Sequence, residues 1–245
     1  MTISPAGSYV PITTPVVETV LLTSFSPEGI VPSENRRFPD PMTSGKTCLV
    51  SFRSGLLGGY TSIVASYVAL LRGINVGGKN LIRMPALKAC FEAHGFADVA
   101  TYIQSGNVLF TASATPAAEL TSRIEAMLAD AFDYVPTVVV RNRKQMRAIV
   151  DRAPKGFGSR PTKYRYDVIF LKEPLTARAA ILQVPTNPAV DTGHAGIGVL
   201  YFSRLEAKAT SSRLNRLVGS PIYPNVTIRN WNTTTMLLSM MESAP

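Results

Sequence analysis

The pattern of hydrophobic and polar positions becomes regular at Tyr67 and predicts six elements in residues 66–141. We expect strands at 67–71, 99–103, 108–111 and 137–140, and helices at 84–94 and 116–132. The first helix places Leu87, Cys90 and Phe91 on one apolar face, at the spacing of a helical turn. Pro85 near its start and Gly95 at its end are typical of the two helix ends. The order β-α-β-β-α-β is the split arrangement of ferredoxin-like folds.

Residues 142–245 predict the same order of elements. A basic helix at 143–152 leads through a loop rich in Pro and Gly to strands at 166–171, 189–192, 198–202 and 226–229, with helices at 176–182, 211–218 and 233–241. The sequence shows no residue-level repeat between the halves, only this shared order. We therefore predict an α+β fold built as a tandem duplication of ferredoxin-like (βαββαβ) subdomains with antiparallel sheets, at 66–141 and 142–245.

Residues 1–65 have no sustained helical or strand period, because prolines, glycines and hydroxyl residues interrupt every apolar run. No basic region precedes an apolar core, so the segment does not resemble a secretory signal. We expect it to be disordered, or to be an extension that is not translated, with Val64 at an alternative start. Residues 55–71 are apolar but too short and too interrupted to span a membrane. The intact mass of the native protein would test the start site.

The composition favours a cytoplasmic protein with a filled core. Hydrophobic residues make up 46% of the chain. Two cysteines, Cys48 and Cys90, and two histidines, His94 and His194, give neither a disulfide framework nor metal-ligand spacing. We expect no metal, no cofactor and no membrane association, and the sequence does not indicate an oligomeric state.

The net charge of +9 lies in one part of the chain. Residues 142–245 contain fifteen basic and six acidic residues, whereas residues 1–65 and 66–141 are each balanced. Such asymmetry is typical of a face that meets phosphate-rich partners. A solvated surface would explain the same charges equally well.

Polar and glycine-rich segments are predicted to meet at one edge of the first sheet. The first two strands of a split β-α-β unit are parallel, so the loop after the first strand should lie beside the turn after the second. We call this loop (72–80) and turn (104–107) the glycine edge; its candidate ligand-binding residues are Arg72, Asn75, Gly77, Gly78, Lys79, Asn80, Gln104, Ser105 and Asn107. Glycine amides and cations suit an oxyanion, but the same residues are common in ordinary turns. The Walker loop spacing is missing.

A third polar motif follows the expected strand at 226–229. Its candidate residues are Arg229, Asn230, Trp231 and Asn232. Trp231, beside an arginine and two amides, could stack on a base or sugar ring, or it could anchor the last helix. We expect Asn232 or Thr233 to cap that helix.

The usual catalytic arrangements are missing from the sequence. There is no paired-carboxylate motif near the glycine edge, no Gly-x-Ser-x-Gly elbow and no cluster of His and Cys. We expect His94 to lie at a helix end and His194 in a hairpin turn, both solvated. Any chemistry would rely on electrostatic stabilisation by Arg, Lys and backbone amides.

The three motifs together resemble a known family. Ala69-Leu-Leu-Arg-Gly-Ile-Asn-Val-Gly-Gly-Lys-Asn80, Thr101-Tyr-Ile-Gln-Ser-Gly-Asn-Val108 and Thr227-Ile-Arg-Asn-Trp-Asn-Thr233 are similar to the family catalogued as domain of unknown function 1697, over about residues 66–241. The resemblance implies two α+β subdomains of ferredoxin-like character. It implies no activity, so no catalytic residue is transferred.

Three functions remain open at this point. The first is binding of a phosphate-bearing ligand, a nucleotide or a nucleic acid, at the glycine edge. The second is a metal-independent enzyme on a small phosphorylated or carboxylated metabolite, with Arg72, Lys79 and Arg229 as clamps. The third is a structural module whose two halves dock through the glycine edge.

Overall fold

The computed structural model describes residues 64–78, 80–132 and 136–243. All of these residues belong to one compact unit of the chain. The expectations for residues 1–63, and the candidate site residue Lys79, lie outside the described residues.

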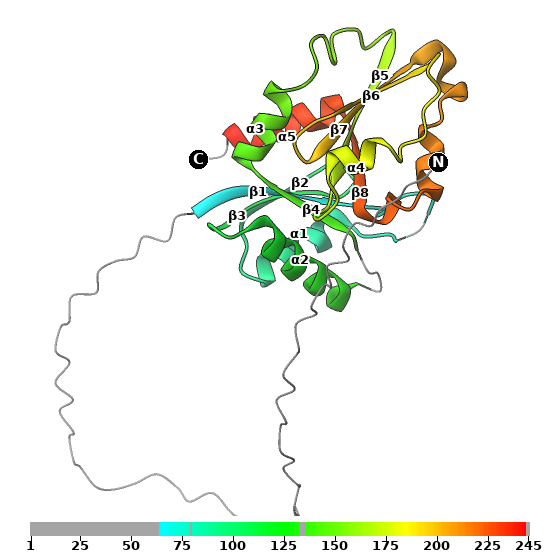
Figure 1. The fold of residues 1–245 in the computed structure, drawn as a ribbon. Coiled ribbons are helices and arrows are strands. Elements are labelled where there is room, and N and C mark those ends of the chain that lie inside the picture. The colour runs from blue at the N-terminus through cyan, green and yellow to red at the C-terminus, as the bar shows by residue number, and fades with distance from the viewer. Residues whose placement is uncertain (1–63, 79, 133–135, 244–245) are drawn as a thin grey trace, which may run out of the picture. The chain divides into compact units, whose positions relative to one another are not determined.

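The first half contains a four-stranded antiparallel sheet with the strand order β2-β3-β1-β4. Its strands are β1 (Val64–Leu71), β2 (Ala97–Tyr102), β3 (Asn107–Ser113) and β4 (Val138–Asn142). Helices α1 (Met84–Ala93) and α2 (Ala117–Ala131) cover one face of this sheet (Figure 1). Each predicted element of this half is present, and the antiparallel pairing is confirmed.

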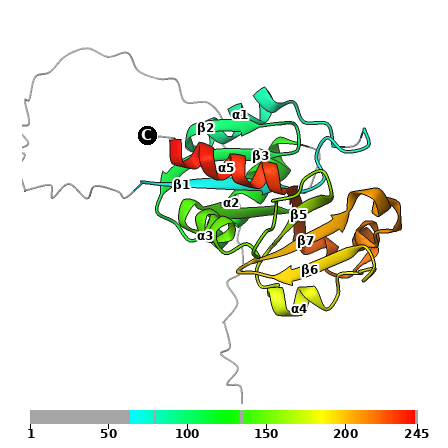
Figure 2. The same ribbon diagram turned by 90° about the horizontal axis from the view of Figure 1, so that it is seen from above.

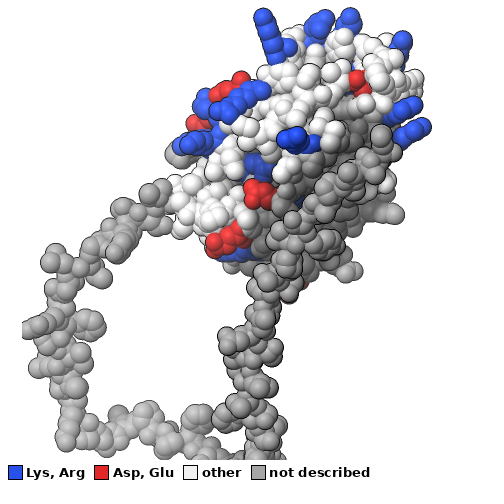
Figure 3. Space-filling view, viewed as in Figure 1, with Lys and Arg blue, Asp and Glu red and all other residues white. Residues whose placement is uncertain are grey.

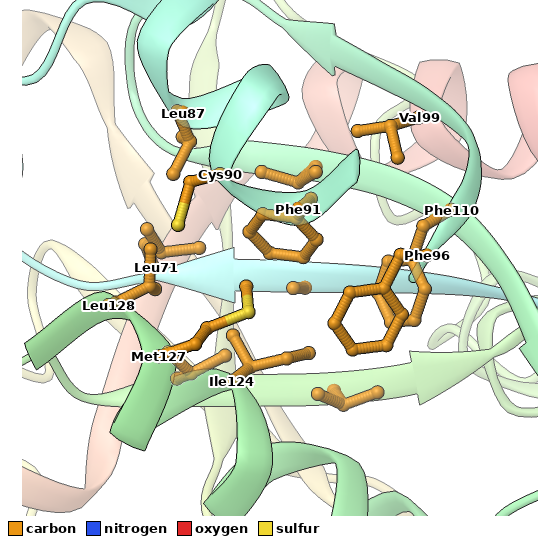
Figure 4. Packing of buried hydrophobic residues seen from close by; sticks show 14 of the residues in the cluster. Leu71, Leu87, Cys90, Phe91, Phe96, Val99, Phe110, Ile124, Met127 and Leu128 are labelled. Atoms are coloured by element: carbon orange, nitrogen blue, oxygen red, sulfur yellow. The ribbon is translucent and has the colours of Figure 1, made fainter. Parts of the chain in front are cut away.

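A cluster of aromatic and aliphatic side chains fills the space between this sheet and the two helices (Figure 4). Phe110 on β3 is at its centre, with its ring 4.7 Å from that of Phe96 and 5.6 Å from that of Phe91, measured between centroids. From the helices, Leu87 and Phe91 of α1 and Ile124 of α2 are fully buried against it. The stripes predicted from helical spacing are therefore the faces that pack.

The second half contains another four-stranded antiparallel sheet, with the order β6-β7-β5-β8. Its strands are β5 (Tyr164–Leu171), β6 (Asp191–Ala195), β7 (Val199–Leu205) and β8 (Val226–Asn230). Helix α4 (Ala177–Ile181) and the short 3₁₀ helices η2 (Leu214–Gly219) and η3 (Tyr223–Asn225) contribute side chains to the core on one face. A further 3₁₀ helix, η1 (Glu206–Ser211), follows β7 and has no buried residue.

Two further helices pack in the region that both sheets share. Helix α3 (Arg143–Asp151) follows β4, and α5 (Trp231–Ser243) follows β8. A third core joins α3 and α5 to Val68 and Leu70 of β1 and to Val168 and Phe170 of β5. Figure 2 shows both helices lying across the first sheet. Among the described residues, no helix is both long and apolar enough to cross a membrane.

Two predictions for the second half were wrong. The expected helix at 211–218 consists of 3₁₀ turns, because Ser212 has extended dihedrals and its hydroxyl accepts a hydrogen bond from the Leu214 amide. His194 lies in strand β6 rather than in a hairpin turn. The turn instead falls at Gly196 and Gly198, where glycine is needed: a Cβ on Gly196 would lie 2.5 Å from the Tyr201 ring.

A residue-level correspondence between the halves does exist, contrary to the expectation from the sequence. Strand β4 reads Val-Val-Val-Arg-Asn and β8 reads Val-Thr-Ile-Arg-Asn. Both pair in the same register with the first strand of their half, since Leu71 faces Val138 and Leu171 faces Val226. Outside the Arg-Asn pair, the two strands contain β-branched residues, which are common in any strand. The correspondence between the two segments is therefore not evident from the sequence alone.

Truncation of the Phe110 ring should remove the centre of the first core. We expect Phe110→Ala to lower the free energy of unfolding by about 3–5 kcal/mol, the usual loss for a buried phenylalanine. Urea denaturation followed by circular dichroism measures this loss. Leu182→Ala, at a position that is 85% exposed, is the control and should change the free energy of unfolding by less than about 0.5 kcal/mol.

Candidate functional site

Arg229 of β8 is buried where the second half meets the glycine edge, and all three of its nitrogens donate hydrogen bonds. Its acceptors are the carbonyls of Leu71 (2.8 Å), Ser105 (2.9 Å), Gly106 (3.1 Å) and Ile228 (2.8 Å), the Thr227 hydroxyl (2.9 Å) and Asn107 Oδ1. None of these acceptors is a carboxylate. Burial lowers the pKa of Arg229 to about 10, so the guanidinium remains charged at neutral pH. Its donors are engaged within the protein.

Asn107, predicted as a ligand residue, is completely buried at the start of β3. Its Nδ2 donates to the Tyr102 carbonyl (2.9 Å) and to Ser105 Oγ (3.1 Å), while its Oδ1 accepts from Arg229. The asparagine thus closes the β2–β3 turn and presents one oxygen to the other half. Ser105 has a part in the same arrangement, through both its hydroxyl and its carbonyl.

The loop of the glycine edge is held by its own asparagines. Asn75 donates to the carbonyls of Ile82 (2.9 Å) and Gln104 (3.0 Å) and accepts from the Ile82 amide (2.8 Å). The bond to Gln104 confirms the predicted proximity of the loop and the turn. Asn80 donates to the Gly73 carbonyl (3.0 Å). Both asparagines have positive φ, which this residue type tolerates better than most.

The remaining residues of the glycine edge lie outside this network or face the second half. Gly77 and Gly78 are exposed, with no atom within 4 Å of an added Cβ. The Gln104 side chain is also exposed. Arg72 donates to Thr137 Oγ1 (3.3 Å) and lies 4.9 Å from the centre of the Tyr223 ring of the second half. The two arginines predicted here as clamps therefore contact protein groups.

Arg141 of β4 mirrors Arg229. It is buried, and its Nη2 donates to the carbonyls of Leu171 (2.6 Å) and Gly198 (3.0 Å) in the second half. Leu171 ends β5 as Leu71 ends β1, and Gly198 precedes β7 as Gly106 precedes β3. Burial lowers the pKa of Arg141, and the charge of Glu173 opposes this shift. Each half thus sends one arginine into the strand ends of the other.

A second pair of contacts is also reciprocal. Lys172, one residue after β5, donates to both carboxylate oxygens of Glu125 in the first half, at 2.6 and 2.8 Å. Arg72, one residue after β1, lies against Tyr223 in the second half. These pairs could not be predicted from sequence, because their members are far apart in the chain.

The third motif, around Trp231, begins helix α5. Asn230, rather than Asn232 or Thr233, caps the helix: its Oδ1 accepts from the Thr233 amide at 2.7 Å. The Trp231 ring packs edge-to-face on Phe157, with 5.1 Å between centroids. Gly158 approaches it so closely that an added Cβ would lie 2.2 Å from its Nε1. Both expected roles of Trp231 thus stay open, because the anchored ring also lines a cleft.

This cleft, which we call the Trp231 cleft, has a volume of about 320 Å³. It forms beside β5, beyond the point where β8 ends and α5 begins. Residues that line it include Tyr164, Arg165, Asp167, Arg204, Trp231 and Asn232. Sequence analysis missed Asp167 and Arg204, because each sits at an ordinary alternating position of a strand. The features of the sequence that could have indicated this cleft are the loop rich in Pro and Gly and the cluster of cations before β5.

Asp167 and Arg204 form an ion pair beside the Trp231 cleft, in which Asp167 is buried and the Arg204 side chain is 17% exposed. Asp167 Oδ2 lies 3.2 Å from Arg204 Nη2. Among the described residues, neither Asp167 Oδ2 nor Arg204 Nε has a hydrogen-bond partner. Burial raises the pKa of Asp167, while the charges of Arg204 and Arg165 oppose this shift. The pair therefore has unused hydrogen-bonding capacity, which is rare for buried polar groups.

The part of the chain that the structure describes contains no obvious set of metal ligands. No group of three or more His, Cys, Asp or Glu residues there could hold an ion. His94 Nδ1 instead contacts the Cys90 carbonyl at 2.8 Å.

The fold and the contacts between its halves define an α+β protein of two antiparallel sheets that exchange buried arginines. Residues 64–201 match the family described as Protein of unknown function (DUF1697), and the chain belongs to this family. The structure of the conserved bacterial protein SP0830 from Streptococcus pneumoniae is similar, with 24% sequence identity and a TM-score of 0.63. The similarity covers 73% of this chain and 99% of that one, and at this identity it concerns the fold alone. No curated protein matches the chain.

Replacement of the buried arginines by lysine should weaken the packing of the halves, because an ammonium cannot satisfy the acceptors of a planar fork. We expect Arg229→Lys to lower the free energy of unfolding by about 2–4 kcal/mol and Arg141→Lys by about 1–3 kcal/mol. Denaturant unfolding measures both. The exposed Arg143→Lys is the matched control; if Arg229→Lys were no more destabilising than this control, the interface role of Arg229 would be refuted.

Alanine substitutions at two glycines with nearly the same φ distinguish the cost of backbone strain from the cost of steric overlap. Gly106 has φ +76° and an added Cβ would lie 2.8 Å from Leu71 Cβ, whereas Gly78 has φ +74° and open space. We expect Gly106→Ala to lower the free energy of unfolding by about 2–4 kcal/mol, and Gly78→Ala by about 1 kcal/mol. Equal losses in thermal or urea denaturation would contradict a close approach at Gly106.

Proposed function

We propose that this protein binds a phosphate-bearing ligand, a nucleotide unit either free or within a single-stranded nucleic acid, in the Trp231 cleft. The sequence favoured a ligand of this kind at the glycine edge. The hydrogen bonds of Arg229, Asn107 and Asn75 engage these side chains within the protein. A cleft of about 450 Å³ at that edge, which Asn75, Arg83 and Gln104 help to line, has one arginine and no aromatic ring among its lining residues. The cleft has two arginines, three aromatic rings and the first turn of a helix. We therefore move the proposed site to the cleft.

The presence of both aromatic rings and guanidinium groups in the lining of the cleft is the main support for the proposal. Trp231, Tyr164 and Tyr166 line one cleft together with Arg165 and Arg204. Aromatic rings stack on bases of any sequence, and arginines bind phosphate oxygens. Arg165 is exposed at the mouth, where it also pairs with Glu206. A ligand phosphate would compete with that surface carboxylate.

The charge around the cleft supports an anionic ligand. Lys155, Arg160 and Lys163 are exposed on the segment that joins α3 to β5. Arg160 and Lys163 lie 5.2 and 5.7 Å from the centre of the Tyr164 ring. Figure 3 shows basic side chains projecting from the upper part of the molecule, where acidic side chains are few. A positive surface raises the local concentration of anions and speeds their association.

A structural role is our second proposal, for the glycine edge itself. Its support is the set of hydrogen bonds from Arg229 to Leu71, Ser105 and Gly106, at 2.8, 2.9 and 3.1 Å. On this proposal the motif residues keep the two halves docked. The proposed enzyme on a small metabolite has less support, because Arg72 and Arg229 contact protein groups.

We also propose that the two halves are a tandem duplication of ferredoxin-like subdomains. Both sheets have the strand order of that fold, and both end in a strand with Arg-Asn at the same register. The second half departs from the pattern, since 3₁₀ turns stand in place of its second helix. Leu214, Leu217 and Ile222 of this segment are buried in the core of the second half.

Binding should depend on the cations beside the cleft. We expect the full chain to bind a fluorescein-labelled 12-nucleotide single strand, with affinity that falls steeply between 50 and 200 mM salt because phosphate contacts release counterions. The double variant Arg160→Ala/Lys163→Ala should bind about tenfold more weakly and reduce the salt slope by about 1 to 2. Fluorescence anisotropy measures both quantities.

The control removes the same charge elsewhere in the second half. Lys208→Ala/Arg216→Ala alters two exposed cations of the 3₁₀ segment and should change affinity less than about threefold. Equal losses in the two double variants would indicate attraction by net charge alone and would refute a site at the cleft. Failure of both oligonucleotides and mononucleotides to bind at 50 mM salt would refute the proposed function.

A further inference from the structure

A second cleft lies on one face of the second sheet. We call it the His194 cleft; its volume is about 190 Å³. On the sheet side it is lined by Tyr166 of β5, Ser203 of β7 and Thr192 of β6, which form one row across three strands, because Tyr166 pairs with Ser203 and Ser203 with Thr192. His194 lies two residues further along β6, so its side chain is on the same face.

The segment between α3 and β5 covers this row and adds two cations. Lys155 and Arg160 of this segment line the His194 cleft. Between them in the sequence, Phe157 packs on the sheet, with its ring 4.9 Å from that of Tyr166 and 5.3 Å from that of Tyr201, measured between centroids. The two cations therefore extend from a backbone that is already anchored to the sheet.

The three cations of the His194 cleft are not neutralised by neighbouring acids. Lys155, Arg160 and His194 form no ion pair with any residue in the described part of the chain. Among the described residues that line the cleft, none is Asp or Glu. Positive charge gathered without a protein counter-ion, beside the hydroxyls of a serine and a threonine, is typical of a site for a phosphate group.

The arginines of the Trp231 cleft are in a different situation. Arg165 pairs with Glu206, and Arg204 pairs with Asp167 at 3.2 Å. A phosphate there would have to compete with a carboxylate. The two clefts nevertheless adjoin, since Tyr164 and Tyr166 line both. A ligand that lies against Trp231 therefore has the cations of the His194 cleft as its neighbours.

The corresponding place in the first half contains an acid. Thr111 pairs with Ser66 as Ser203 pairs with Tyr166. The Thr111 hydroxyl donates to Asp98 Oδ2 at 2.8 Å, and Asp98 lines the cleft at that place. A carboxylate there repels a phosphate, so the conditions for an anion site are met in the second half only.

We propose that the His194 cleft binds a phosphate group of the ligand whose base or sugar lies in the Trp231 cleft. Lys155, Arg160 and a ring nitrogen of His194 donate to the phosphate oxygens, and the hydroxyls of the cross-strand row donate beside them. The phosphate is either the terminal group of a mononucleotide or a phosphodiester of a single strand. This inference rests on the proposed function, because it places the phosphate of the same ligand.

The chain provides a natural reporter in each cleft. Trp231 is the only tryptophan, and His194 is one of two histidines. The other, His94, lies in the first half with its Nδ1 2.8 Å from the Cys90 carbonyl, so it serves as an internal reference. The full chain is titrated with adenosine, AMP and the dinucleotide ApA, while Trp231 fluorescence and the histidine ring resonances in NMR spectra are followed. The spectrum of His194→Gln assigns the resonances.

We expect AMP or ApA to quench Trp231 and to move the His194 resonances, with those of His94 unchanged. AMP should bind at least tenfold more tightly than adenosine, which lacks the phosphate. Adenosine should quench Trp231 without moving His194. Movement with AMP alone would assign the cleft to a terminal phosphate, and movement with ApA would assign it to a phosphodiester.

A variant separates loss of phosphate contacts from loss of structure. Lys155→Ala/His194→Gln should weaken AMP or ApA about tenfold and change binding of adenosine less than about twofold. The control, Lys208→Ala, removes an exposed lysine of η1 and should change each affinity less than about twofold. Circular dichroism verifies that both variants fold. An equal loss for adenosine and AMP in the folded double variant would overturn the phosphate role of these residues.

The outcomes distinguish the inference from the function on which it rests. Quenching of Trp231 by AMP and ApA without movement of His194 would overturn the place of the phosphate and leave nucleotide binding standing. Equal movement of His94 and His194 would indicate a general effect and would overturn the inference in the same way. Absence of any change at Trp231 and His194 with all three compounds and with the 12-nucleotide strand would overturn both proposals.

Discussion

The burial of a guanidinium without a neighbouring carboxylate is the constraint on which this structure depends. A charge removed from water must have its donors satisfied, or the folded state loses several kcal/mol. Arg229 meets this requirement only where the end of β1 and the turn before β3 bring their carbonyls together. The conformation of the glycine edge and the position of β8 therefore fix each other. Glycine at 106 is part of this requirement, since a side chain there would displace Leu71.

The same device, a buried arginine followed by an asparagine, is used twice, once in each direction, and only Arg141 has a carboxylate, that of Glu173, nearby. Strands β4 and β8 each end in Arg-Asn: the arginine crosses to the strand ends of the other half, and the asparagine caps the helix that follows. Asn142 accepts from the Gln145 amide as Asn230 accepts from the Thr233 amide. The two helices then pack in the core that the sheets share. One dipeptide thus couples strand pairing, contact between the halves and the start of a central helix.

The sequence predicted most elements of the fold and the meeting of the loop with the turn, but not the role of the site residues. Hydrophobic periodicity is local, so it identified β1, α1 and the β2–β3 hairpin. The expected parallel strands predicted that the loop lies beside the turn, and the bond between Asn75 and Gln104 confirms it. The contacts of Arg229 with Leu71, Ser105 and Gly106 could not be predicted, because these partners lie more than a hundred residues away in sequence. Asp167 and Arg204 were missed because a charged residue in a strand is normally predicted to face solvent. The sequence does not show which other segments pack against it.

The two copies of the device also explain why a ligand site would develop in only one of them. Beyond Arg-Asn, the first copy continues with Arg143 and Lys144, beside Ala65 and Ser66 on β1. The second copy continues with Trp231 and Asn232, beside Arg165 and Tyr166 on β5. In both, the arginine donates hydrogen bonds to the other half and the asparagine caps the helix that follows, whereas the next residues lie beside the open edge of a first strand. We therefore propose the Trp231 cleft as the ligand site rather than the glycine edge, where a substitution of Asn107 or Gly106 also changes how the halves dock.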